Sequence, residues 1–73
     1  MSQQEMVLLD YYVVCISEFA SSHNISMKDA YVYLSRNKGL EFIKEFYDVE
    51  HTLSFDDVVG DLTSVCRKNG GGI

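Results

Sequence analysis

Three Ser-x-x-acid tetrapeptides divide a chain of 73 residues that contains no proline. They read SQQE from Ser2, SMKD from Ser26 and SFDD from Ser54. In such a capping box the serine hydroxyl accepts a hydrogen bond from the backbone amide three residues on, which a helix start would otherwise leave unpaired. Each box therefore predicts the start of a helix. Because β-rich and loop-rich chains need Gly and Pro at their turns, the pattern predicts an all-α fold.

The first helix is predicted to run from the Ser2 box to about His23, and it is apolar around most of its circumference. At 100° per residue, one broad apolar face comprises Met6, Leu8, Leu9, Tyr12, Val13, Cys15, Ile16, Phe19 and Ala20. A narrow polar strip comprises Asp10, Ser17 and Ser21. Beyond this strip, a second apolar stripe comprises Val7, Tyr11 and Val14. Such a helix is either the central element of a small bundle or one whose second stripe meets another chain.

Two shorter helices are predicted in the middle of the chain. Asn24 suits a left-handed C-cap before the Ser26 box, and Gly39 ends the second helix or begins the next turn. Residues 31–33 (YVY) have strand-like propensity, but the box before them favours a helix. The third helix is predicted from Leu40 to Val49, with Leu40, Ile43, Phe46 and Tyr47 on its buried face.

Glu50 would enter the apolar arc of the third helix if that helix continued by one residue. Burying an unpaired carboxylate is costly. We therefore expect the helix to end before Glu50.

The fourth helix is predicted to start at the Ser54 box and to end near Asn69. Its apolar stripe comprises Phe55, Val58, Val59, Leu62, Val65 and Cys66. Helices of such unequal length rarely form a regular bundle. The sequence thus predicts one all-α domain over residues 1–69, an irregular or orthogonal bundle of about four helices, followed by a flexible Gly-rich tail at 70–73.

The two cysteines, Cys15 and Cys66, lie among apolar residues at helical spacing and are interpreted as reduced core residues. The N-terminus is acidic where a secretion signal would be basic, and the apolar run from Met6 to Ile16 is too short to span a bilayer. A cytoplasmic location, with no membrane partner, is expected.

No residue pattern predicts a catalytic, cofactor or metal site, so we expect a protein that is not an enzyme. His51 lies near Asp48 and Glu50, but no nucleophile or second ligand is close in sequence. His51 is more simply a residue that caps a helix end. The acids that follow Ser54 lack the alternating spacing of a calcium loop and are explained by helix capping.

Two surfaces are the candidates for binding a partner. One is the acidic face of Glu41, Glu45 and Asp48, and the other is the stripe of Val7, Tyr11 and Val14. The net charge is −5, and residues 41–61 contain seven acids with Lys44 as the only lysine or arginine, which disfavours nucleic acid. We therefore expect a protein-interaction module, for which self-association and a foreign protein partner are equally compatible. The alternative is a helix-turn-helix DNA-binding regulator, which needs a basic recognition helix.

Two segments resemble a known family. Residues 42–52 read FIKEFYDVEHT, and residues 13–20 read VVCISEFA. Together with the order of the helices, they resemble the bacterial domain-of-unknown-function family 3791. Tyr47, His51 and Thr52 are the motif residues to which the resemblance assigns no established role. Glu50 stands where this family usually has leucine.

The resemblance implies no established activity. It implies small helical accessory proteins that are often encoded beside larger partners, some of which are similar to ADP-ribosyltransferase-like toxins. An antitoxin-like or adaptor role is therefore expected from the resemblance, and it does not follow from composition.

Overall fold

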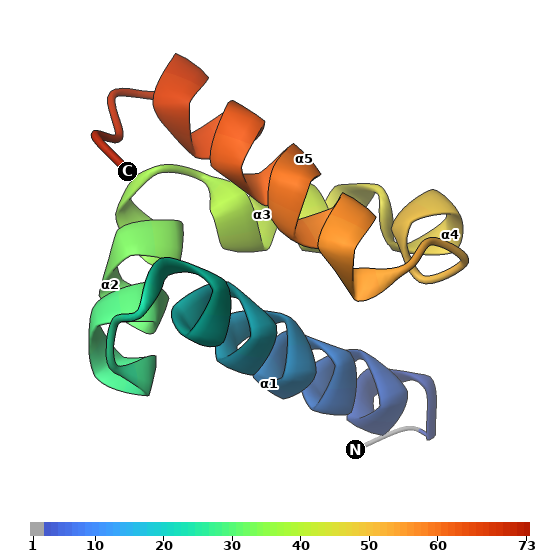
Figure 1. Ribbon diagram of the computed structural model, residues 1–73. Coiled ribbons are helices and arrows are strands. Elements are labelled where there is room, and N and C mark those ends of the chain that lie inside the picture. The colour runs from blue at the N-terminus through green and yellow to red at the C-terminus, as the bar shows by residue number, and fades with distance from the viewer. Residues whose placement is uncertain (1–2) are drawn as a thin grey trace.

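Five helices and no strand make up the part of the chain that is described, which comprises residues 3–73, with side chains from Met6 onward, in a computed structural model. The helices are α1 (Gln3–His23), α2 (Met27–Arg36), α3 (Gly39–Glu45), α4 (Tyr47–Glu50) and α5 (Phe55–Lys68). In Figure 1 the two long helices, α1 and α5, lie on opposite sides of the molecule, α2 lies at one end and the short α4 at the other. The predicted all-α, irregular bundle is confirmed.

Two of the predicted capping boxes are confirmed at their serines. Ser26 Oγ accepts a hydrogen bond from the backbone amide of Asp29 (3.0 Å), and Ser54 Oγ accepts one from that of Asp57 (3.3 Å). Both serines have extended backbone angles and immediately precede α2 and α5. The box at Ser2 lies outside the described residues. Local sequence therefore sets these two helix starts.

The left-handed cap predicted at Asn24 is also confirmed, with φ of 55°. The amide of Ile25 donates to the carbonyl of Ala20 (2.9 Å), as in a Schellman ending. At the end of α2 the left-handed position is filled by Lys38 (φ 65°) and not by glycine. Gly39 begins α3, where it is buried.

The helix predicted from Leu40 to Val49 is interrupted at Phe46. Phe46 has φ of −108° and ψ of 21°, so the chain leaves the helical path after α3 and restarts as the four-residue α4. The amide of Glu50 donates to the carbonyl of Phe46 (2.8 Å), which places Glu50 inside α4. The prediction that the helix ends before Glu50 is wrong, because Glu50 is helical and buried.

The core is formed mainly by the C-terminal part of α1 and by α2, α3 and α5. Its buried apolar residues are Cys15, Phe19, Ala20, Ala30, Leu34, Ile43, Val58, Val59, Leu62 and Cys66. The interpretation of Cys15 and Cys66 as core residues is confirmed, and both thiols are free. Among residues 6–14 of α1, only Tyr11 and Tyr12 pack against this core, and both are half-buried. Residues 6–14 are therefore poorly covered.

Residues 70–73 fold back against α2. The Ile73 amide donates to Tyr33 Oη (3.1 Å), and Arg67 Nε donates to the Ile73 carbonyl (2.7 Å). The flexibility expected for this segment stays a prediction.

Gly39 packs where no side chain fits. A Cβ at this position would lie 2.7 Å from Leu34 Cδ2 and 3.2 Å from Cys66 Sγ, and both of those side chains are fully buried. Gly60, in contrast, lies exposed within α5 with nothing within 4 Å of an added Cβ.

These two glycines predict opposite effects of the same substitution. Gly39→Ala should lower the free energy of unfolding by about 1–3 kcal/mol because it overpacks the core. Gly60→Ala should raise it by about 1 kcal/mol through helix propensity. Urea denaturation followed by circular dichroism measures both changes. A Gly39→Ala variant as stable as the parent would contradict the close packing of α3 on α5.

Candidate functional site

The acidic residues proposed for partner binding are all exposed but do not form one helix face. Glu41 and Glu45 lie on α3, whereas Asp48 lies on α4 beyond the interruption at Phe46. Lys44 lies beside Glu45 on α3. The surface is acidic as predicted, but it belongs to two short helices.

The predicted stripe of Val7, Tyr11 and Val14 is divided by burial. Val7 and Val14 are exposed, whereas Tyr11 is half-buried and packs against the core. The ring of Tyr11 lies 5.2 Å from that of Tyr47 and 6.2 Å from that of Phe55, between centroids. Tyr11 therefore joins α1 to α4 and α5, and only the two valines remain on the surface.

A larger apolar surface lies on the same half of α1. Met6, Leu9 and Val13 belong to the broad apolar face predicted for this helix, and all three are exposed. Together with Val7 and Val14 they form what we name the exposed apolar face of α1, with each side chain between 39% and 58% exposed. Asp10 is the one charged residue among residues 6–14. In the sequence, the polar strip of Asp10, Ser17 and Ser21 indicates which side of α1 faces solvent.

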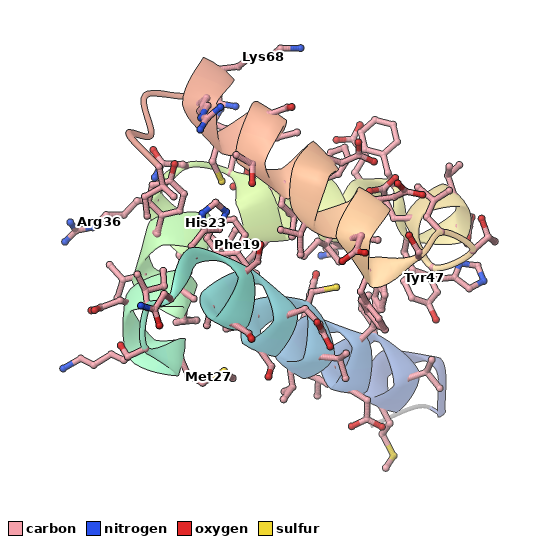
Figure 2. All side chains as sticks on the ribbon, viewed as in Figure 1. Phe19, His23, Met27, Arg36, Tyr47 and Lys68 are labelled. Carbon is pink, nitrogen blue, oxygen red and sulfur yellow. The ribbon has the colours of Figure 1, made fainter. Side chains whose placement is uncertain are left out.

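This surface arises because α1 is longer than the helices that cover it. α1 has 21 residues, α5 has 14 and α2 has 10. Figure 2 shows Phe19 and His23 near the end of α1 that meets α2, whereas Tyr47 lies at the other end of the molecule. The described core residues of α1 begin at Cys15, so the preceding apolar residues lack a complete cover.

The motif residues Tyr47, His51 and Thr52 form a small capped corner. The rings of Tyr47 and His51 are stacked, with centroids 4.6 Å apart and planes at 13°. His51 Nδ1–H donates to the Tyr47 carbonyl (2.6 Å), and Thr52 Oγ1 donates to the Val49 carbonyl (2.7 Å). The prediction that His51 caps a helix end is confirmed. These side chains bond to the same two carbonyls that accept from the backbone amides of His51 and Thr52, and so they reinforce the end of α4.

Beneath this corner lies a buried carboxyl group that sequence reasoning did not place. Glu50 is 4% exposed, and its Oε1 has no hydrogen-bond partner among the described residues. Burial raises the pKa of Glu50 to about 7, and the hydrogen bond and charge of Asp61 and the charge of Asp57 add to the rise. A neutral carboxyl is less costly to bury than a carboxylate. Near neutral pH, Glu50 is therefore a protonated acid in a substantial share of molecules.

The phenol of Tyr11 and the thiol of Cys15 lie near Glu50. Tyr11 Oη is buried without a partner among the described residues, and burial raises the pKa of this phenol, with Cys15 and Glu50 adding to the rise. Burial also raises the pKa of the Cys15 thiol to about 11. A thiol with that pKa is a poor nucleophile near neutral pH. The phenol of Tyr11 and the thiol of Cys15 therefore stay protonated near neutral pH, and neither is an activated nucleophile.

The other histidine connects two helices. His23 Nε2 lies 3.1 Å from Thr63 Oγ1, and this hydroxyl donates to the Val59 carbonyl (2.8 Å). Among the side chains of residues 6–73 there is no group of three or more His, Cys, Asp or Glu arranged to hold a metal ion.

The comparisons with known proteins agree with this picture of an unassigned helical domain. The family model described as "Protein of unknown function (DUF3791)" matches residues 10–69, and the chain belongs to that family. No curated protein and no solved structure matches the chain. Within residues 3–73, no helix has both the length and the apolar character needed to cross a membrane.

Glu50 predicts a specific pH dependence of stability. Its pKa is raised from 4.5 to about 7, so the folded chain binds this proton more tightly than the unfolded chain. The contribution of Glu50 to the free energy of unfolding therefore falls as pH rises from 4.5 to about 7, by about 3 kcal/mol in all. Glu50→Gln removes this dependence because it cannot ionise.

Urea denaturation at a series of pH values tests this prediction. The stability of Glu50→Gln relative to the parent should rise by about 3 kcal/mol between about pH 4.5 and pH 8. The exposed Glu45→Gln variant is the matched control for the loss of one carboxylate. The same pH profile for both variants would show that burial does not raise the pKa of Glu50.

Proposed function

We propose that the domain is a non-enzymatic protein-interaction module that binds another protein through the exposed apolar face of α1. One observation carries this proposal: five large apolar side chains within residues 6–14 are exposed. Several exposed apolar side chains on one side of a small domain commonly mark an interaction site. Apolar residues at i, i+3 and i+7, here Met6, Leu9 and Val13, are the spacing by which a helix docks into a groove.

The charges beside this face favour a foreign partner over a second copy. Residues 6–22 contain Asp10 and Glu18 and no lysine or arginine. In a symmetric pair of α1 helices each face meets itself, so the Asp10 carboxylates of both copies would be brought into the contact with no lysine or arginine of this segment to pair with. A partner with an apolar groove and a rim of lysine or arginine is complementary to this face, and complementary charge speeds association.

An antitoxin-like role is one specific form of this proposal. A module that covers part of a larger protein neutralises that protein when the covered part includes its active site. We propose as the partner the product of a neighbouring gene, with a basic surface beside an apolar groove. The resemblance supports this form, and the acidic character of residues 41–61 is compatible with it.

The alternative function, DNA binding, requires a basic recognition helix, and α3 does not meet this requirement. The would-be recognition helix α3 has seven residues and carries exposed Glu41 and Glu45. Such a helix repels phosphate. An enzyme would need an activated group, and the buried phenol and thiol beside Glu50 are held protonated.

Site-specific photo-crosslinking in the source cells tests the proposal. A photoreactive amino acid replaces Val13 on the exposed apolar face of α1, and in a control chain it replaces Ser64, which is exposed on α5. The Val13 position should give one adduct of defined mass, and the Ser64 position should give none.

A charge substitution adds a second test of the same surface. Asp10→Lys should weaken the Val13 adduct at low salt, because it opposes a basic rim, while leaving the circular dichroism spectrum unchanged. Equal adducts from Val13 and Ser64, or no adduct from Val13, would overturn the proposal. An adduct with the mass of two copies of this chain would replace the foreign partner with self-association.

A further inference from the structure

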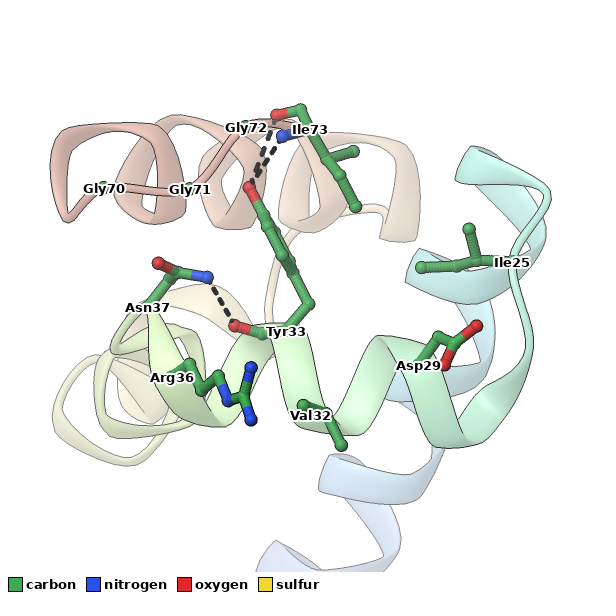
Figure 3. A pocket seen from close by; sticks show the side chains of 10 residues that line it. All are labelled: Ile25, Asp29, Val32, Tyr33, Arg36, Asn37, Gly70, Gly71, Gly72 and Ile73. Atoms are coloured by element: carbon green, nitrogen blue, oxygen red, sulfur yellow. Dashed lines mark hydrogen bonds between the residues drawn. The ribbon is translucent and has the colours of Figure 1, made fainter.

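A groove lies between α2 and residues 70–73, which follow α5, on the part of the molecule away from α4. It is open to solvent and has a volume of about 470 Å³. Its lining consists of Ile25, Asp29, Val32, Tyr33, Arg36, Asn37 and residues 70–73. Figure 3 shows the last four residues crossing above Tyr33, with Ile25 and Asp29 on one side and Arg36 and Asn37 on the other. The chain's own tail thus forms one wall of the groove.

A Schellman ending of α5 directs the tail into this position. Gly70 has a left-handed φ of 98°, and its amide donates to the Arg67 carbonyl (3.3 Å). The Gly71 amide then donates to the Cys66 carbonyl (2.8 Å). This pair of bonds is the Schellman pattern, which reverses the chain at the helix end.

Beyond the turn, the tail is held by its main chain and not by its side chains. The Ile73 amide donates to Tyr33 Oη (3.1 Å), the same hydroxyl approaches the Ile73 carbonyl (3.5 Å), and Arg67 Nε donates to that carbonyl (2.7 Å). An extended segment offers the N–H and the C=O of one residue in the same way. The protein side of these contacts is therefore suited to a bound peptide.

The hydroxyl that makes these contacts is held in place by the core. The ring of Tyr33 stacks on the fully buried ring of Phe19, with centroids 5.7 Å apart and planes at 19°. The backbone carbonyl of Tyr33 accepts a hydrogen bond from Asn37 Nδ2 (2.9 Å), which closes the end of α2. The Tyr33 ring is thus held by contacts that do not involve the tail.

One tail position accepts only glycine. A Cβ on Gly71 would overlap the hydroxyl oxygen of Tyr33 and would lie 2.9 Å from the Cys66 carbonyl oxygen. The second contact is with helical backbone, which cannot move aside. An added Cβ on Gly72 would meet nothing within 4 Å. The groove therefore selects glycine at position 71 and tolerates a side chain at position 72.

Two positions after this glycine, an aliphatic side chain faces the cavity. In Figure 3 the side chain of Ile73 points from the tail into the space between Tyr33 and Ile25. Val32 adds apolar surface to the same cavity, and Asp29 and Arg36 provide charged groups at its edge. The groove thus has a pocket for an aliphatic residue.

We propose that the face of α2 that lines this groove, together with Arg67, is a binding site for extended peptide segments of the form Gly-x-aliphatic, and that residues 71–73 occupy this site as a ligand in cis. This site is distinct from the exposed apolar face of α1 and does not rest on the function proposed for that face. A tethered ligand has an effective concentration in the millimolar range, so the tail excludes weaker segments of other chains. Displacing the tail opens the site.

Matched glycine substitutions in the full chain test this proposal. Gly71→Ala should expel the tail, whereas Gly72→Ala should leave it in place. The probe is a fluorescent peptide with the sequence Gly-Gly-Gly-Ile, blocked at both ends so that no terminal charge contributes. Fluorescence anisotropy should show at least tenfold tighter binding to Gly71→Ala than to the parent or to Gly72→Ala.

Two controls test the specificity of the site. The peptide Gly-Ala-Gly-Ile places a side chain at the glycine position and should not bind the Gly71→Ala chain. Adding Tyr33→Phe to that chain keeps the ring but removes the hydroxyl, and it should weaken binding of Gly-Gly-Gly-Ile at least tenfold. Equal binding of both peptides, or equal binding to the parent and to Gly71→Ala, would overturn the proposal.

A measurement on Tyr33→Phe alone covers the case in which Gly71→Ala does not fold. Loss of the hydroxyl should release the tail, so the heteronuclear NOE of the Ile73 amide should fall to the value of a free terminus. The parent should show the value of an ordered helix. An Ile73 amide that is equally mobile in both chains would show that the tail is not a ligand of Tyr33.

Discussion

The fold depends on the burial of one ring, that of Phe19. It is fully buried, stacks on Tyr33 of α2 and lies 4.4 Å from the ring of His23, between centroids. His23 in turn reaches Thr63 of α5. A fully buried aromatic side chain contributes several kcal/mol in a core of this kind. Because these contacts join α1 to α2 and α5 at one end of α1, the core gathers there, and the other end of α1 keeps its apolar residues exposed.

The two ends of the molecule consequently differ in chemistry. At the Phe19 end, the core fixes Tyr33, and the hydroxyl of Tyr33 holds the tail. Basic residues also lie at this end of the molecule: Figure 2 shows Arg36 and Lys68 on the side away from Tyr47. At the other end, Tyr11 is the inward contact of α1 with the α4 corner, where the surrounding charges are acidic. One small core therefore supports two separate surfaces, one apolar and one suited to a peptide main chain.

Features that depend on a few neighbouring residues were predictable from the sequence. The caps at Ser26 and Ser54 and the left-handed Asn24 involve hydrogen bonds within one helical turn, so the pattern of residue types identifies them. The burial of Cys15 and Cys66 follows from apolar spacing that is unambiguous around each cysteine. The family resemblance, which the match over residues 10–69 confirms, rested on motifs of the same local kind.

Features that depend on the lengths of other helices were not predictable. Leu9 and Val13 have the spacing of core residues, but no helix is long enough to cover them.

The burial of Glu50 was rejected because a buried carboxylate is costly, which is correct for the charged form alone. With a pKa of about 7, Glu50 can enter the core corner as a neutral acid. The helix is interrupted at Phe46, before the short helix α4 in which Glu50 is buried. No proline or glycine near Phe46 indicates this interruption in the sequence.

The central claim is that the exposed apolar face of α1 serves a different protein. Sedimentation equilibrium of the purified chain tests it most directly, over a wide range of protein concentration at neutral pH and moderate salt. We expect the mass of one chain at every concentration, both for the parent and for Val13→Glu. A parent that forms dimers, together with a Val13→Glu variant that does not, would show that the face binds a second copy and would contradict the claim.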